Sequence, residues 1–410
     1  DMIAAGDTII VLPGTYNRND DTELSFLDDS YQPKNLVLQS RDGAATTILD
    51  GEDKRVFDIS DGTDTTLQII GFTITASDGG EDDADGSVIK IHGDSYNNNN
   101  QQIIEYSGVT FKNCIIKDVD GEDSPIEVIY GKAIFNDCEI SGNTFNADDY
   151  DEDAIGGAIR MGGPYSYGSS IVHFYRSKLV NNTVTADQPQ YVHGGAIGIG
   201  GDDHDVKLVN TIVAGNSINF NSSNDSYPIG GGGIKMRGGN LLLINCTIAD
   251  NQVNGAVTWS DASGSAIHVE DYLQDDNPTK LTIFNSIIYR NTTITNTSSS
   301  TVTDHNDQIY VNSDGNDGAD IYASYSLFGG DDDLEGDEIL LNTYPDFTDT
   351  TYVLHERSPA IGAGATESVD VEDETIYVPS NDLAGNVRPN PSGSSPDLGA
   401  YEHELAVTLY

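Results

Sequence analysis

Short runs of alternating apolar and polar residues recur along the chain. Seven of them share one pattern and begin at Leu67, Val109, Ala133, Val172, Val206, Leu241 and Leu281. Alternation with a period of two, in segments rich in Ile, Val, Phe and Thr, predicts short β-strands. No segment keeps helical periodicity over a dozen residues. The pattern therefore predicts an all-β protein.

Aligned on one another, the seven runs repeat particular residue types at particular positions. One position is mostly Asn, in the series Gly71, Asn113, Asp137, Arg176, Asn210, Asn245 and Asn285. The next position is Phe72, Cys114, Cys138, Ser177, Thr211, Cys246 and Ser286. Five runs close on a further Asn, namely Asn143, Asn182, Asn216, Asn251 and Asn291. Asn tolerates left-handed backbone and its amide can hydrogen-bond along a stack, so these positions indicate turns and ladders.

These repeats predict a single parallel β-helix. Their spacing is irregular, roughly 24 to 42 residues, with constant strand cores, as in a solenoid with variable loops. A β-propeller is the main alternative, but it needs four strands per repeat and these units have two or three. We expect coils over 1–330 and a looser C-terminal coil and cap region over 331–410 of the same domain, folding back over the last coil. Corner loop insertions are expected at 78–86, 97–102, 146–153 and 219–227.

Three stretches resemble known β-helix proteins. The opening AAGDTIIVLPGTYN, with KNLVLQSRDGAATTILDG and LQIIGFTIT, resembles the first coils of secreted right-handed β-helix proteins of the pectin-lyase-like superfamily. The GGAI and FxN repeats resemble polymorphic outer-membrane proteins. The end, from NSIIYRNTT to DLAGNVRPNPSGSSPDLGAYE, resembles the closing module that precedes interchangeable sorting or anchor domains in bacterial surface proteins.

The resemblance implies a right-handed helix that is extracellular or on the bacterial cell surface. It leaves activity open, because the superfamily includes lyases, hydrolases, epimerases, adhesins and structural proteins. Two departures from the pattern are expected to matter. The amphipathic helix that usually caps the first coil is missing before Asp1, and no anchor follows Tyr410.

The charge of the chain limits its binding partners, and its cysteine content indicates whether disulfides form. The chain has 19 Lys and Arg against 67 Asp and Glu, a net charge of -48. Nucleic acid and anionic membranes are therefore poor partners. No apolar run approaches the ~20 residues of a membrane span.

Cys114 and Cys138 lie 24 residues apart at one repeat position, so we expect stacked free thiols rather than a disulfide.

A second family of runs carries candidate chemistry. Each has a small-residue turn, an apolar residue, a variable residue and another apolar residue. The variable position holds Lys90, Arg160, Gly198, Lys235 and His268. Alternation sends this position outward, together with His92, Arg237 and Glu270, and predicts an exposed basic ladder. An insertion before Arg160 could hold an extra coil and interrupt it.

The ladder is a candidate site for an anionic glycan. In lyases that share the resembled fold, uronate polysaccharides lie along such a face. The resemblance implies Lys235 as base, Arg237 as carboxylate clamp, Arg160 as a contact to a neighbouring sugar and His268 as acid. The candidate glycan-binding set is Lys90, His92, Arg160, Lys235, Arg237, His268 and Glu270. The alternative is structural, because outward strand positions are polar by default and cations relieve repulsion among carboxylates.

Acidic loops are candidate calcium sites. Calcium takes six to eight oxygen ligands, and the loop with Asp331, Asp332, Asp333 and Asp337 is dense in them. None of these loops has the spacing of a known calcium motif, so solvated loops without an ion are the alternative. The eight His residues show no zinc spacing.

Two functions remain open. The first is an exported, non-enzymatic surface, adhesive or fibre-forming protein, whose partner is an extracellular polysaccharide or a cell surface. Residues 404–410 read as a strand that could pair with the first coil of the next molecule and give a head-to-tail homopolymer. The second is a polysaccharide lyase or epimerase that acts on a uronate glycan at the ladder.

Overall fold

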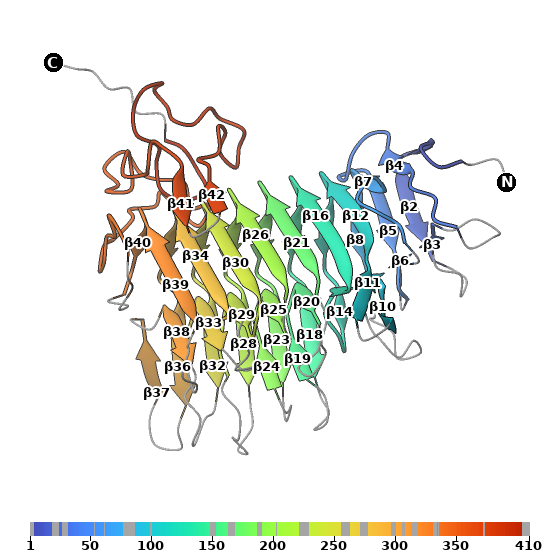
Figure 1. The fold of residues 1–410 in the computed structure, drawn as a ribbon, viewed down its shortest axis with the longest axis horizontal. Helices are drawn as coiled ribbons and strands as arrows, with labels where there is room; N and C mark the ends of the chain where they lie inside the picture. Colours follow the sequence, from blue (N-terminus) through green and yellow to red (C-terminus); the bar gives the residue numbers. More distant parts are fainter. Residues whose placement is uncertain are drawn as a thin grey trace.

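The fold is a long stack of β-coils (Figure 1), seen in a computed structural model of the chain. The residues that the structure describes are 4–18, 24–26, 32–52, 54–60, 62–76, 87–98, 101–147, 153–162, 169–186, 191–201, 203–220, 229–255, 263–270, 278–296, 301–305, 308–312, 319–330, 334, 336–371 and 374–403.

Three long sheets form the body of the stack, and all strand pairs within them are parallel. Sheet A contains β1 (Thr8–Val11), β4 (Val37–Ser40), β7 (Gln68–Ile70), β12 (Ser107–Lys112), β16 (Gly131–Asn136), β21 (Ile171–Tyr175), β26 (Asp205–Val209), β30 (Asn240–Ile244), β34 (Lys280–Phe284) and β39 (Asp320–Ser324). Sheet B contains β2 (Gly14–Asn17), β5 (Thr47–Asp50), β8 (Thr73–Thr75), β13 (Ile115–Lys117), β17 (Glu139–Ser141), β22 (Lys178–Val180), β27 (Ile212–Ala214), β31 (Thr247–Ala249), β35 (Ile287–Tyr289) and β40 (Leu327–Phe328). Sheet C contains β3 (Leu24–Ser25), β6 (Phe57–Ile59), β9 (Ile89–His92), β15 (Ile126–Ile129), β20 (Ile159–Met161), β25 (Ile197–Ile199), β29 (Ile234–Met236), β33 (Ile267–Glu270) and β38 (Ile309–Asn312). The predicted all-β parallel β-helix is confirmed.

From β13 to β35, each sheet B strand is followed by a projecting arm before the chain reaches sheet C (Figure 1). The arm sheet contains β14 (Asp120–Gly121), β18 (Thr144–Ala147), β23 (Thr183–Ala186), β28 (Ser217–Phe220), β32 (Gln252–Gly255), β36 (Thr292–Asn296) and β37 (Thr301–Asp304). The chain returns along β19 (Asp153–Ile155) and β24 (Tyr191–His193). A separate apolar cluster that includes Phe145, Val184, Val192 and Ile218 fills the arm.

Two antiparallel hairpins lie outside this scheme. The first, β10 (Asp94–Asn98) with β11 (Gln101–Glu105), occupies the insertion predicted at 97–102. The second, β41 (Val369–Val371) with β42 (Glu374–Ile376), lies in the C-terminal region. The insertions predicted at 78–86 and most of 146–153 and 219–227 lie outside the described residues.

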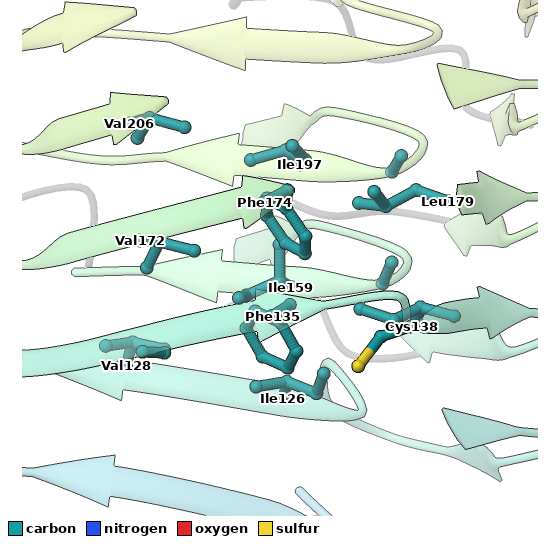
Figure 2. Close-up of a cluster of buried hydrophobic side chains, with 14 of the residues drawn as sticks. Ile126, Val128, Phe135, Cys138, Ile159, Val172, Phe174, Leu179, Ile197 and Val206 are labelled. Carbon is teal, nitrogen blue, oxygen red and sulfur yellow. The ribbon is translucent and has the colours of Figure 1, made fainter. Parts of the chain in front are cut away.

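The coil interior is filled by stacked identical side chains. The rings of Phe111, Phe135 and Phe174 lie nearly parallel, with centroids 5.1 and 4.8 Å apart. Figure 2 shows Phe135 and Phe174 one above the other among branched aliphatic side chains. Cys114, Cys138 and Cys246 are buried free thiols, as predicted. The repeat alignment therefore places these side chains correctly.

The first Asn position forms the corner between sheets A and B. Its members all have left-handed backbone, with φ from 47° at Arg176 to 76° at Gly71. The left-handed conformation costs Asn little conformational energy, which explains the frequency of Asn at the corner.

The second Asn position forms a continuous buried ladder. The Nδ2 of Asn182 donates to Oδ1 of Asn216 at 2.9 Å, and Nδ2 of Asn216 donates to Oδ1 of Asn251 at 2.9 Å. Each Nδ2 also donates to a backbone carbonyl, for example Asn216 to Leu179 at 2.9 Å. Gln308 ends the series as the acceptor for Asn291. The structural interpretation of both Asn positions is confirmed.

The C-terminal region extends further than the last coil. It packs on the outer faces of sheets A and B through Ile376, Tyr352 and Leu398. Its buried Arg388 donates from Nε to Glu402 at 2.9 Å and from Nη1 to the corner residue Asn210 at 2.8 Å. Corner residues Asn245 and Asn285 also bond to this region. The prediction of a cap over the last coil therefore underestimated its reach. Residues 404–410, predicted as a strand, lie outside the described residues.

Replacing Asn216 with Ala should lower the free energy of unfolding by about 3 kcal/mol, because it leaves buried amide partners unsatisfied on both sides. Urea denaturation would measure the loss. Asn240→Ala, at an exposed position one coil further on, is the control and should change stability by less than about 0.5 kcal/mol. Equal stability of the two variants would contradict a stabilising ladder.

Candidate functional site

The predicted ladder residues occupy one column of sheet C. Cross-strand register links Asp58, Lys90, Glu127, Arg160, Gly198, Lys235, His268 and Tyr310 in that order. Strand β15 supplies Glu127 between Lys90 and Arg160, so the insertion does hold an extra coil. The column is therefore of mixed charge and not purely basic.

In the N-terminal half of the ladder, each basic side chain lies close to a carboxylate of a neighbouring coil. Lys90 Nζ lies 3.4 Å from Glu127, and Arg160 Nη1 lies 3.3 Å from Asp123. His92 Nε2 lies 2.9 Å from Asp58. Burial raises the pKa of Asp123 to about 6 although the Arg160 charge opposes the shift. These side chains are only partly exposed, 17% for Lys90 and 23% for Arg160.

In the C-terminal half, three basic side chains converge on Glu270. Lys235 Nζ lies 3.0 Å from Glu270 Oε1, Arg237 Nε lies 3.0 Å from Oε2, and His268 Nε2 lies 3.2 Å from Oε1. Lys235 and Glu270 come from adjacent strands, β29 and β33, and His268 lies two residues before Glu270. We call these four residues, with His193, the Glu270 cluster.

The expectation that this cluster is exposed is wrong. The side chains of Lys235, Arg237 and His268 are 1%, 4% and 0% exposed. The outward face of sheet C is covered by the returning arm segments, where Ile155, His193, Gly230 and Ser263 form a second column. The predicted outward direction of the ladder is thus correct, but around Lys235, Arg237 and His268 the outward face is covered.

Side-chain sizes in the two facing columns are complementary. Gly198 leaves space for Ile155, since a Cβ at Gly198 would lie 2.4 Å from Ile155 Cγ2. Gly230 leaves space for His268, since a Cβ there would lie 1.9 Å from Nδ1 of the ring. Gly198 therefore interrupts the ladder because a branched side chain fills its place.

Burial and mutual charge set the protonation of the cluster. Burial disfavours the Glu270 carboxylate, but Lys235 and His268 together hold its pKa well below the ordinary range. Burial, assisted by the Lys235 charge, lowers the pKa of His268 to about 4 and that of His193 well below its ordinary value. Burial also lowers the pKa of Lys235, against the attraction of Glu270. At neutral pH both imidazoles are uncharged, and they lie beside a Lys–Glu–Arg group.

This arrangement has limited chemical options. A base or clamp must touch its substrate, and these side chains have almost no accessible surface. The residues cast as base, clamp and acid are brought together, whereas Arg160 is separated from Lys235 by the Gly198 coil. Lys90, His92 and Arg160 remain partly accessible at the other end of the column.

Sequence reasoning missed His193, Asp123 and Glu127. His193 directly precedes the glycine pair of its run, at a position that holds Ile155, Gly230 and Ser263 in other coils, so no common residue type marks it. Glu127 lies in a coil whose run, SPIEVIY, lacks the glycine turn. Its period-two alternation was the only available signal.

The described residues contain no cluster of three or more His, Cys, Asp and Glu side chains arranged to hold a metal ion. Of the calcium candidates, Asp337 is exposed, and Asp331, Asp332 and Asp333 lie outside the described residues. In the part of the chain that is described, we find no helix with the length and hydropathy of a membrane span.

Comparison with known proteins returns no assignment. No protein-family model matches the chain, and no curated protein matches it. The fold is that of the parallel β-helix repeat proteins.

Replacing Lys235 with Met should lower the free energy of unfolding by about 3 to 5 kcal/mol, because it removes one partner from a buried ion pair. For an exposed ladder the same substitution would have a negligible effect, because exposed charges contribute little to stability. Lys117→Met is the control, since Lys117 is 45% exposed beside Asp118 and should contribute no more than about 1 kcal/mol. Chemical denaturation of both variants would measure the difference, and equal losses would refute a buried structural pair.

His204 is a buried histidine outside the Glu270 cluster, and its protonation should affect the stability of the fold. Its Nδ1 accepts a hydrogen bond from the Ser170 N–H at 3.1 Å, and its Nε2–H donates one to the Gly200 carbonyl at 2.7 Å. Both ring nitrogens are therefore hydrogen-bonded when the ring is neutral. Burial lowers its pKa to about 4. Because the folded pKa lies below the unfolded value of about 6.5, the stabilisation is present above pH ~6.5 and is lost toward pH ~4.

His204→Gln should therefore flatten the dependence of stability on pH between ~6.5 and ~4 by roughly 3 kcal/mol relative to the unmodified chain. Urea denaturation at several pH values would measure the two slopes. The exposed His305→Gln variant should keep the original slope. If His204→Gln also keeps it, His204 is not the group that titrates.

Proposed function

We propose that the chain is a non-enzymatic parallel β-helix that acts as an exported surface, adhesive or fibre-forming protein. The observation that carries the proposal is the burial of Lys235, Arg237 and His268 around Glu270. These are the residues on which an enzymatic interpretation depends. Here they hold neighbouring coils and the arm together, which is a structural task.

The competing function is a polysaccharide lyase or epimerase acting on a uronate glycan. It is favoured by the convergence of a Lys, an Arg and a His within 3.2 Å of one carboxylate. However, Glu270 already occupies the position where a substrate carboxylate would be neutralised. An enzyme would also have to lift the arm from sheet C and expose the apolar cluster that fills it, at a considerable hydrophobic cost.

Export and surface location rest on the resemblance to the pectin-lyase-like superfamily and to anchored bacterial proteins. The charge of -48 supports a highly solvated surface. An extracellular polysaccharide or cell surface as partner, bound calcium in the acidic loops, and head-to-tail assembly through residues 404–410 belong to the same proposal.

Incubation with alginate and with pectate tests the proposal. Unsaturated uronate products absorb in the ultraviolet, and we expect none above the rate of a heat-denatured sample. If product does form, the same assay with His268→Gln and with Lys117→Met decides its origin. Product that is lost in His268→Gln but retained in Lys117→Met would overturn the non-enzymatic function.

A further inference from the structure

A groove lies on the outer face of sheet A, on a different sheet from the Glu270 cluster. Its cavity volume is about 380 Å³, within the range of small-ligand sites. Strands β26, β30, β34 and β39 form its floor, and Val371 of the β41–β42 hairpin contributes to its lining. The groove therefore lies where the C-terminal region meets the coils.

The hairpin covers only part of this face. It packs on Val209, Ile244 and Phe284, the outward residues nearest the corner, and also on Leu242. Two neighbouring columns line the groove, and Leu242 belongs both to the groove lining and to the hairpin contact. One is Asp205, Asn240, Lys280 and Asp320, and the other includes Leu242, Thr282 and Tyr322.

The lining combines hydrogen-bonding groups with apolar surface. The carboxylates of Asp205 and Asp320 accept hydrogen bonds, and the ammonium of Lys280 donates them. The side chains of Asn240 and Thr282 can do both. The side chain of Tyr322 supplies aromatic area beside them, and the mostly buried Leu242 adds a small apolar area. Such a mixture suits a ligand whose hydroxyl groups donate and accept while its C–H faces pack on a ring.

Charge argues against an acidic ligand. Two carboxylates and one ammonium line the groove, and the chain carries a net charge of -48. A polyanion would be repelled both locally and at long range. The neighbouring His173 is already paired with Asp205 at 3.1 Å and adds no independent anion site.

The repeat also suits an extended ligand. Equivalent positions recur at about 4.8 Å from coil to coil, so the column from Asp205 to Asp320 offers a regular series of polar contacts across the strands. A linear chain of sugar rings lying along the helix axis would meet one member of each column per coil.

We propose that this groove binds a neutral oligosaccharide, lying across β26, β30, β34 and β39. The inference rests on the proposed adhesive role and gives it a ligand class and a location. Tyr322 packs against a sugar ring, and Asp320, Asn240 and Thr282 bond to its hydroxyl groups.

Isothermal titration of the full chain with β-1,4-linked glucose, mannose and galactose hexasaccharides, and with hexagalacturonate, tests the groove. We expect saturable binding of at least one neutral hexasaccharide and weaker or absent binding of hexagalacturonate. Tyr322→Ala should lower the affinity about tenfold, the loss of one ring contact. Asp320→Asn, at an exposed position, should lower it severalfold without affecting folding.

Tyr16→Ala is the matched control, because Tyr16 is 43% exposed in the first coil, far from β39, and should leave affinity unchanged. No binding of any neutral hexasaccharide, tighter binding of hexagalacturonate, or affinity unchanged by both groove variants would overturn the proposal. Mass spectrometry of the bound sugar separates the two proposals. Cleavage would refute the non-enzymatic function and leave the groove standing, whereas absence of both binding and cleavage would refute the groove alone.

Discussion

The parallel stacking of coils is the constraint on which the rest of the structure depends. Backbone hydrogen bonds fix each strand against the next in register, so every side chain lies over its equivalent one coil away. A position is stable only if its residues suit one another along the column. Phe135 on Phe174 satisfies this through ring stacking, and Asn182 on Asn216 satisfies it through one shared amide hydrogen bond.

Charged columns satisfy the same constraint by alternation. Lys90, Glu127 and Arg160 follow one another in adjacent coils, so each cation has a carboxylate within one strand spacing. Where Gly198 interrupts the alternation, Lys235 obtains its counter-charge from Glu270 in the next coil. A cation in a covered column must have such a partner, because an isolated buried charge would cost far more than the pair.

The strands, both Asn positions, the stacked thiols and the common column of Lys90 and His268 could be predicted because each is encoded within one repeat. The burial of that column could not. The covering residues Ile155, His193 and Ser263 have no common chemistry, and they cover sheet C only because the arm folds back on it. The contact of Arg388 with Asn210 could not be predicted either, because the left-handed corner already explained the asparagine at that position.

Outward direction and accessibility are therefore separate properties in this fold. A strand in a simple β-helix exposes every second side chain, but here the arm covers the later strands of sheet C and the C-terminal region covers parts of sheets A and B. Basic residues in covered columns become structural, because their charges must be matched inside the protein. Recognition of another molecule is then restricted to the outward positions that neither layer reaches. On sheet A these positions include the columns through Asn240 and Thr282, where polar side chains remain partly accessible beside the hairpin.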